Sequence, residues 1–332
     1  MRIYVLEGLR NLPSIDLITL RHGLFQTPIA SDILRQVDSL SKCDAALVPH
    51  DAYFFNQNKD FVSYLNEISK FKTVVFSDRG DYPKRPKISN SVALRVALEP
   101  GERVTGKIIV PYNVESLSFV PLREYRRTPE VSFVGYVPNI SIGRVARTLM
   151  HSPFHPVKGN GAIARRTVIR QLQHSNLAHS IIPRGSYGAH IHTAIELDSS
   201  RSEYIRSIQE SDYVLSPRGD ANQSARFYEA LSAGRIPIVP NTNLTLPVYG
   251  TKCATPNLTP YLSTLLFSSP KRLKKIVLSH WATLDSKDSY MQTQISLRKL
   301  FTDGLEFNAF FRALFGLSYL DFINRAHLKI YD

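Results

Sequence analysis

Two arginines, a serine and a glutamate lie close together between residues 218 and 229, in a pattern suited to binding phosphate. Arg218 stands in an expected turn, beside Gly219. Ser224 and Arg226 stand in the first turn of the helix expected next. The free amides and the positive dipole end of a helix N-terminus attract anions, and guanidinium groups bind phosphate oxygens in pairs. This pattern predicts a cradle for a diphosphate, beside which Glu229 could accept hydrogen bonds from ribose hydroxyls.

The same spacing also has a simpler interpretation. Arg226 and Glu229 are three residues apart, so they share one face of a helix. They could form an ion pair on the surface of an ordinary amphipathic helix. The local pattern alone leaves both interpretations open.

A strand and a turn are expected to place Arg218. Residues 212–215 form a short apolar run with β-prone side chains, and the polar cluster at 216–220 stops it. Pro217 and Gly219 in that cluster are typical turn residues. The turn should therefore lie at the end of a strand.

A helix and a second strand complete the unit. Asn222 is expected to cap a helix over 224–232, and Gly234 to end it in a left-handed conformation. Residues 236–240 are continuously apolar, which is typical of a parallel strand covered on both faces. Pro237 fits a central strand only near its start. The whole segment predicts a strand–helix–strand unit.

This segment resembles the C-terminal signature of the exostosin-like glycosyltransferases of the GT47 type. The matching positions are Ser211, Tyr213, Leu215, Pro217, Gly219, Asp220, Ser224, Arg226, Glu229, Ala230, Leu231, Gly234, Ile236 and Pro237. Two positions depart from the signature. Gln223 replaces a hydroxyl residue, and Arg235 replaces a cysteine. We expect Arg235 to add a charge near the donor pocket.

Weaker similarities to the same family run along the rest of the chain. Residues 42–49 and 74–78 resemble two of its N-terminal strands, and residues 131–135 resemble the start of its second domain. Arg144 and the pair at 165–166 follow in the expected order. Fucosyltransferase-type enzymes share part of the C-terminal signature, so the motif alone does not define the subfamily.

The fold class expected from the alternation of strands and helices is α/β, with open parallel sheets. In the first part of the chain, strands are expected at 3–6, 45–49, 73–77 and 107–111, and helices at 30–40 and 61–71. In the second part, a strand is expected at 132–136, helices near 143–150 and at 163–173, and a loop at 151–162.

The resemblance implies a GT-B architecture, in which two Rossmann-like domains face a cleft and C-terminal helices cross back. The charged, Pro-bounded segment 121–130 is the expected domain boundary. We predict an acceptor-side domain over 1–122, a nucleotide-sugar-binding domain over 123–290 and a helical tail over 291–332. The tail carries phenylalanines at helical spacing and should brace the two domains.

The resemblance also implies transfer of a sugar from a nucleotide-diphosphate donor to a glycan or other hydroxyl acceptor, with inversion. A uridine nucleotide is the first choice for the donor, and no separate cofactor is expected. Arg144, Arg218, Ser224 and Arg226 are the candidates for holding the diphosphate, because positive groups and helix amides can stabilise it without a metal. Gly135 would leave the backbone open for close approach to the phosphates.

Inversion requires a general base for the acceptor hydroxyl. Asp51 and Asp78 are the first candidates because they follow N-terminal strands, and His50 and Asp81 lie beside them. Each aspartate could instead be a turn or cap residue. His190 and His192 are two residues apart but lack a third ligand nearby, so we expect no metal site.

The chain has 332 residues and a formal net charge of +13, with a pI near 9.7. Its composition is normal for a soluble protein of two domains. Such a basic surface favours a nucleic acid, an acidic membrane face or an anionic substrate as partner. Zinc spacing and RNA-binding aromatic patterns are lacking, which makes nucleic acid the weakest of the three. The basic segment 271–277 could rest on anionic lipid, or could be a solvated helix face.

The presence of only two cysteines favours a reducing compartment, and no apolar run approaches the roughly 20 residues that a membrane span needs. We therefore expect a cytoplasmic enzyme, with a peripheral position on the inner membrane face as a variant, or a trimmed form of a longer protein. Three other functions stay open: a GDP-sugar-dependent, fucosyltransferase-like enzyme; a non-catalytic glycan- or nucleotide-binding relic; and a basic nucleic-acid binder.

Overall fold

The computed structural model of the chain describes residues 1–7, 35–78, 86–99, 102–103, 105–137, 139, 142–143, 146, 150, 160–185, 194–219, 221–247, 261–265 and 268–326. Several predictions fall wholly or mostly outside these residues. They concern Asp81, Arg144, His190, His192, Asp220, the helix near 143–150 and the loop at 151–162.

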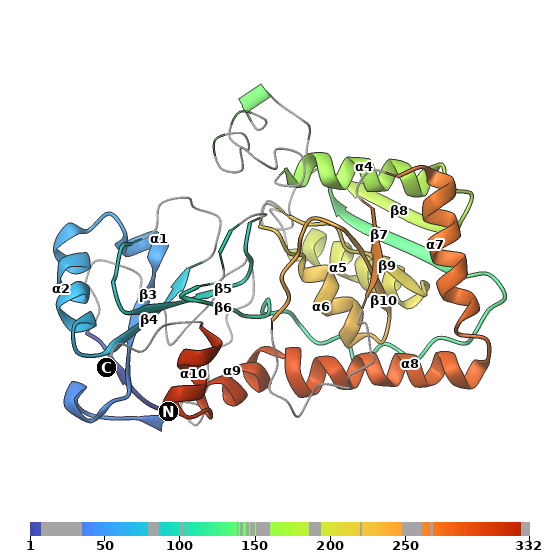
Figure 1. Cartoon of the computed structure of the whole chain (residues 1–332). Helices are drawn as coiled ribbons and strands as arrows, with labels where there is room; N and C mark the ends of the chain where they lie inside the picture. The colour runs from blue at the N-terminus through green and yellow to red at the C-terminus, as the bar shows by residue number, and fades with distance from the viewer. Residues whose placement is uncertain are drawn as a thin grey trace.

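The first half of the chain forms a six-stranded parallel sheet with strand order β2-β1-β3-β4-β5-β6 (Figure 1). Its strands are β1 (Arg2–Val5), β2 (Arg35–Gln36), β3 (Ala45–Asp51), β4 (Thr73–Asp78), β5 (Ser91–Arg95) and β6 (Lys107–Ile109). Helices α1 (Ala52–Phe55) and α2 (Lys59–Ser69) follow β3. Asn58 caps α2 by accepting a hydrogen bond from the Phe61 amide.

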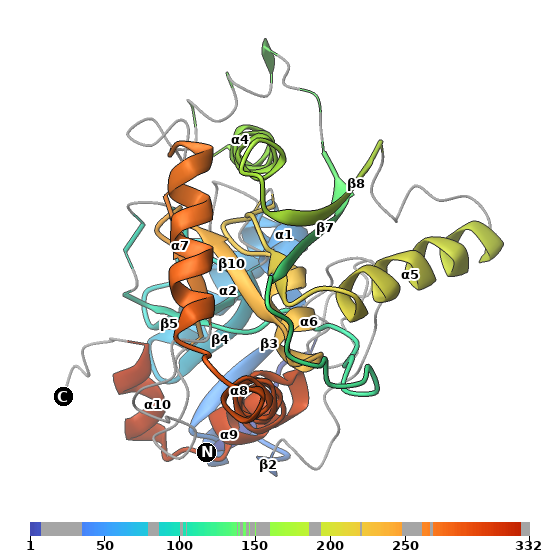
Figure 2. The same ribbon diagram turned by 90° about the vertical axis from the view of Figure 1, so that its right-hand side faces the viewer.

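The second half forms a five-stranded parallel sheet with strand order β11-β10-β9-β7-β8. Its strands are β7 (Glu130–Tyr136), β8 (Ala178–Arg184), β9 (Tyr213–Leu215), β10 (Ile236–Pro240) and β11 (Leu262–Thr264). Its helices are α4 (Gly161–Gln173), α5 (Ala194–Gln209), α6 (Ala225–Ser232) and α7 (Pro270–Ala282). Figure 2 shows α4 and α7 on one face of this sheet and α5 and α6 on the other.

The C-terminal helices cross from the second half to the first (Figure 1). They are α8 (Lys287–Leu300), a π-helical turn (Phe301–Leu305), α9 (Phe307–Phe315) and α10 (Tyr319–Arg325). The hydroxyl of Tyr319 hydrogen bonds to Thr73 Oγ1 on β4 at 2.7 Å. The amide of Gly106, next to β6, donates to the carbonyl of Ala326 at 2.8 Å. The tail is therefore fixed to the first sheet.

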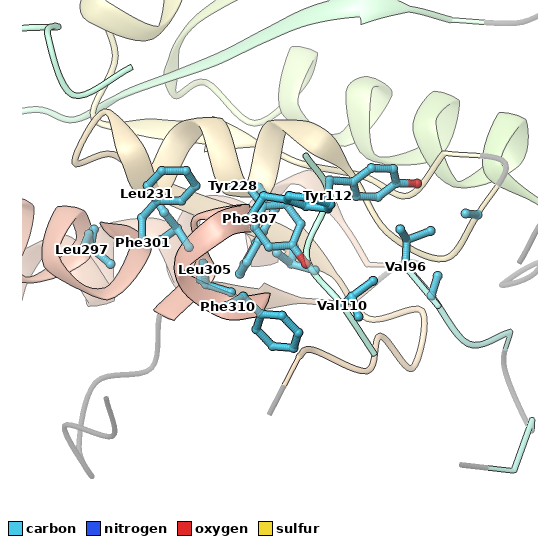
Figure 3. Close-up of a cluster of buried hydrophobic side chains, with 14 of the residues drawn as sticks. Val96, Val110, Tyr112, Tyr228, Leu231, Leu297, Phe301, Leu305, Phe307 and Phe310 are labelled. Atoms are coloured by element: carbon cyan, nitrogen blue, oxygen red, sulfur yellow. The ribbon is translucent and has the colours of Figure 1, made fainter. Parts of the chain in front are cut away.

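Alternate residues of the first sheet belong to two different cores, as the period of a strand requires. Ala46, Val48 and Phe76 pack in one cluster with α1 and α2. Residues on the other face, such as Leu47 and Val75, belong to a cluster that also contains the tail and the second sheet. Figure 3 shows part of that cluster, in which side chains of α6 and of the tail lie together with Val96 and Val110. One apolar core therefore joins the two halves.

The α/β fold class predicted from the sequence is confirmed: two parallel sheets flanked by helices, with C-terminal helices crossing back. The unit β9-α6-β10 forms as expected, and Pro237 is the second residue of the central strand β10. The helix predicted over 30–40 is wrong in its described part. There, Arg35–Gln36 pairs with β1 as a short edge strand.

Candidate functional site

In the second sheet, the order in which the chain adds strands reverses between β7 and β9. The chain leaves β7 through α4 toward β8 on one side, and leaves β9 through α6 toward β10 on the other. In open parallel sheets, ligands bind outside the carboxyl ends of the strands at such a point. Gly135 at the end of β7 and the 216–219 turn after β9 lie at this edge.

Arg226 lies directly against the end of β7. Its Nε donates a hydrogen bond to the carbonyl of Val134 at 2.7 Å, and its guanidinium carbon lies 4.9 Å from the centre of the Phe133 ring. Gly135 has a φ of +154°, and a Cβ built on it would stand 1.7 Å from Arg226 Nη2. Gly135 therefore leaves room for a guanidinium group, where we expected it to leave room for phosphate.

Arg165 on α4 connects the two loops of this edge. Its Nε donates to the carbonyl of Arg218 at 3.0 Å, and its Nη1 donates to the carbonyl of Tyr136 at 2.9 Å. The side chain is buried. The sequence pattern predicted no separate role for Arg165. A charged residue among the apolar positions of a helix face, with Ala162 and Ile169 at helical spacing, was the available signal.

Arg218 reaches across to the first half of the chain. Its Nη2 and Nη1 lie 2.9 and 3.0 Å from the two carboxylate oxygens of Glu99, in a bidentate ion pair. The Arg218 side chain is 1% exposed and that of Glu99 is 25% exposed. Arg218 is therefore at the interface of the two halves and is engaged by a carboxylate.

Ser224 is the N-cap residue of α6, but its hydroxyl makes no capping hydrogen bond. Asn222, which we expected to cap this helix, has another role. Its Nδ2 donates to the carbonyl of Leu98 in the first half at 3.1 Å and to that of Thr242 at 3.0 Å. Gly219 donates its amide to the carbonyl of Gln223 at 2.9 Å, which closes the turn before the helix.

Glu229 is bound by α5. Arg201 Nη1 donates to one carboxylate oxygen at 2.8 Å, and the Tyr204 hydroxyl donates to the other. Burial, and then the Glu229 carboxylate, raise the pKa of Tyr204 well above its usual value, so the phenol stays a donor. Burial opposes a charge on Arg201, but Glu229 nevertheless raises the pKa of Arg201. Arg201 and Tyr204 together fix the orientation of the Glu229 carboxylate.

Arg235 does not lie near the predicted donor site. It immediately precedes β10, so it stands at the amino edge of the sheet, opposite the carboxyl edge. It is fully buried, and its Nη1 donates to Gln294 Oε1 on α8 at 2.8 Å. Burial lowers the pKa of Arg235 to about 10. Its charge therefore serves the packing of the tail, which corrects our expectation of a charge at the donor pocket.

The candidate bases lie at the carboxyl edge of the first sheet. Asp51 is the last residue of β3, and its backbone is the part that the structure describes. Asp78 ends β4, is buried, and lies 3.4 Å from Arg95 Nε at the end of β5. His50 is also buried, with its ring 6.0 Å from that of Phe61. Asp78 therefore holds a buried guanidinium in place.

Two further expectations can be compared with the described part of the chain. Within it, no group of three or more His, Cys, Asp or Glu side chains could hold a metal ion. None of the helices described there is long and apolar enough to cross a membrane.

Comparison with known families gives one match, on the segment that carries the predicted site. Residues 161–295 match the family model of the RXYLT1 C-terminal domain. This segment includes Arg218, Ser224, Arg226 and Glu229. No curated protein matches the chain.

Several solved structures are similar in fold. The glycosyltransferase of Rickettsia africae ESF-5 has 12% identity and a TM-score of 0.37, over 85% of this chain and 70% of that one. The catalytic domain of starch synthase IV from Arabidopsis thaliana, bound to ADP and acarbose, has 10% identity and a TM-score of 0.40, over 86% and 73%. TarM has 11% identity and a TM-score of 0.32, over 80% and 56%.

These structural similarities concern the fold alone. The family match lies on the strand–helix–strand unit in which the sequence predicted the phosphate cradle. The family match, and not the fold, supports glycosyl transfer as a general activity.

Proposed function

We propose that this protein transfers a sugar from a nucleotide-diphosphate donor to a hydroxyl acceptor, with inversion and without a metal ion. A UDP-sugar is the first choice for the donor, and a glycan is the first choice for the acceptor. The donor binds the second half of the chain and the acceptor binds the first. We also propose that the resemblance to exostosin-like glycosyltransferases, which rests mainly on the C-terminal signature, applies to the whole chain.

The position of Arg226 carries this proposal. Its guanidinium is fixed on the end of β7 by Val134 and Phe133, at the sheet edge where α6 begins. The first turn of α6 and the half-buried Arg226 lie at the same edge. A diphosphate there would meet helix amides and a guanidinium that need no rearrangement.

The residues suggest the following steps. A base at the carboxyl edge of the first sheet, Asp51 first, takes the proton of the acceptor hydroxyl. The acceptor oxygen then attacks the anomeric carbon from the face opposite the leaving group. The bond between that carbon and the diphosphate oxygen breaks, and its electron pair stays on the diphosphate. Arg226 and the α6 amides stabilise the charge that develops there, while Glu229 orients the ribose.

Calorimetric titration with UDP and with GDP tests the proposal. We expect UDP to bind more tightly, and Arg226→Ala to weaken binding by roughly tenfold or more because a charge-assisted hydrogen bond is lost. Arg272→Ala on the exposed start of α7 is the matched control and should leave binding unchanged. Wild-type affinity in Arg226→Ala, with the fold intact by circular dichroism, would overturn the proposal. Tighter binding of GDP would favour the fucosyltransferase-like alternative.

One observation favours a second candidate, a nucleotide- or glycan-binding relic without catalysis. The carboxylate of Asp78 is buried beside Arg95, which suits a structural role better than proton transfer. A relic would bind UDP with the same dependence on Arg226 but would release no nucleotide from any UDP-sugar. Release of UDP from a donor screen would exclude it.

A further inference from the structure

Glu99 in the first half of the chain forms an ion pair with Arg218 in the second half. It follows β5 and lies at the carboxyl edge of the first sheet. Both of its oxygens contact the terminal nitrogens of Arg218, at 2.9 and 3.0 Å. The Arg218 Nε donates to the carbonyl of Gly219 at 3.3 Å. The outer edge of this guanidinium is therefore taken by a carboxylate.

A carboxylate and a phosphate present oxygen pairs that match the same guanidinium edge. Arg218 directly precedes Gly219 in the turn before α6. The carbonyl of Arg218 accepts a hydrogen bond from Arg165. The pair is largely removed from water, since the arginine is 1% exposed and the glutamate 25% exposed. Because water is largely excluded, an anion bound to Arg218 competes directly with any other anion for the same guanidinium.

The surroundings hold Glu99 in position. Its amide donates to Glu102 Oε2 at 3.1 Å, and Glu102 Oε1 in turn accepts from Arg95 Nη1 at 2.6 Å. Next to it, the carbonyl of Leu98 accepts from Asn222 at 3.1 Å. The loop that carries Glu99 is therefore anchored on both halves of the protein.

We propose that Glu99 occupies, in the free protein, the place on Arg218 that the donor diphosphate takes on binding. Glu99 is thus a positioning residue that keeps Arg218 oriented and lowers affinity for the donor. This inference rests on the proposed function, because it names how that same site is filled before the donor arrives. An ion pair that only joins the two halves is the competing explanation.

The test is calorimetric titration with inorganic pyrophosphate. We expect Glu99→Gln to bind pyrophosphate about tenfold more tightly than the wild type, because Arg218 loses its internal anion. Glu99→Asp keeps the charge but shortens the side chain, so it should also bind more tightly. In the double variant Glu99→Gln/Arg218→Ala the gain should vanish. The Asp variant also serves if the Gln variant does not fold.

Glu130→Gln is the matched control. Glu130 pairs with Arg123 at 3.1 Å, with side chains 28% and 6% exposed, at the amino edge of the second sheet. It reports the effect of losing one negative charge far from Arg218. Unchanged or weaker binding of pyrophosphate by Glu99→Gln and Glu99→Asp would overturn the inference, as would an equal gain in Glu130→Gln or a gain that survives Arg218→Ala.

The same experiments separate this inference from the proposed function. If UDP binds the wild type in an Arg226-dependent manner while the Glu99 variants match the wild type, only the role of Glu99 is overturned. If neither UDP nor pyrophosphate binds the wild type or any variant, both proposals are overturned. A fall in thermal stability of Glu99→Gln without a change in affinity would establish the purely structural ion pair.

Discussion

The guanidinium of Arg226 lies so close to the backbone of Gly135 that residue 135 has no room for a side chain. A Cβ at residue 135 would stand 1.7 Å from Arg226 Nη2 and 2.7 Å from its central carbon. The φ of +154° adds backbone strain for any other residue. The end of β7 and the start of α6 thus depend on each other for their local geometry.

Gly135→Ala should therefore displace Arg226. We expect UDP affinity to fall roughly tenfold, as in Arg226→Ala, together with a loss of about 1–3 kcal/mol in the free energy of unfolding. Gly185→Ala, for which a Cβ meets no atom within 4 Å, is the control. Calorimetry and urea denaturation measure the two effects. Wild-type affinity in Gly135→Ala would show that Arg226 is not held at this edge for binding.

Arg165→Met should loosen the loops that Arg165 connects. The buried carbonyl of Arg218 would lose a donor, at a cost of about 1–3 kcal/mol in the free energy of unfolding, and the partly buried carbonyl of Tyr136 would lose one at a smaller cost. UDP affinity should fall as well, because the two loops that Arg165 connects would no longer be fixed. Arg166→Met is the neighbouring control, because Arg166 is exposed and bonds to Asn139. Equal stability of both variants by urea denaturation would contradict this interpretation.

The two candidate bases should respond differently to substitution. Asp51→Ala is expected to lower sugar transfer by about 10²–10⁴-fold, with UDP affinity and stability unchanged, because it removes only the proton acceptor. Asp78→Ala should instead lower the free energy of unfolding by about 3 kcal/mol, because it leaves the buried Arg95 with one partner fewer. Donor-turnover assays and denaturation compare the variants. Full turnover in Asp51→Ala would exclude it as the base.

His280 should make stability depend on pH. Burial lowers the pKa of His280, whose Nδ1 lies 2.7 Å from the Tyr213 hydroxyl. Below pH 6.5 the unfolded chain binds a proton that the folded state resists, so stability is full above pH 6.5 and falls as pH drops toward the folded-state pKa. The slope from one proton is at most about 1.4 kcal/mol per pH unit. Urea denaturation between pH 7.5 and 5.5 should show a smaller slope in His280→Gln, and identical slopes would refute the assignment.

The sequence predicted the centre of the second sheet well because its signals are local. The apolar run that became β10 and the turn residues before α6 fix their own structure. The exposed edge strand β2 has two polar residues and no alternation, so periodicity could not reveal it. Helix α5 was missed for a similar reason, because its composition is mixed along its length.

The partners of the site residues could not be predicted because they come from distant parts of the chain. Glu99 and Arg218 are separated by 119 residues, and Gln294 and Arg235 by 59. Helical spacing suggested Glu229 as a neighbour of Arg226, whereas its carboxylate is bound by Arg201 on another helix. Patterns in a sequence show which side chain is charged, but tertiary packing decides which charge meets it.

The core that α9, α10 and the π-helical turn share with both sheets has a mechanical consequence. Enzymes with two lobes commonly exchange ligands by hinge bending, which is easy where the contact between the lobes is small and polar. Here hinge bending would pull phenylalanines such as Phe301 and Phe311 out of apolar surroundings. We therefore expect the two halves of the protein to stay nearly rigid relative to each other and to unfold in a single cooperative step. Movements of loops and side chains should then control ligand entry.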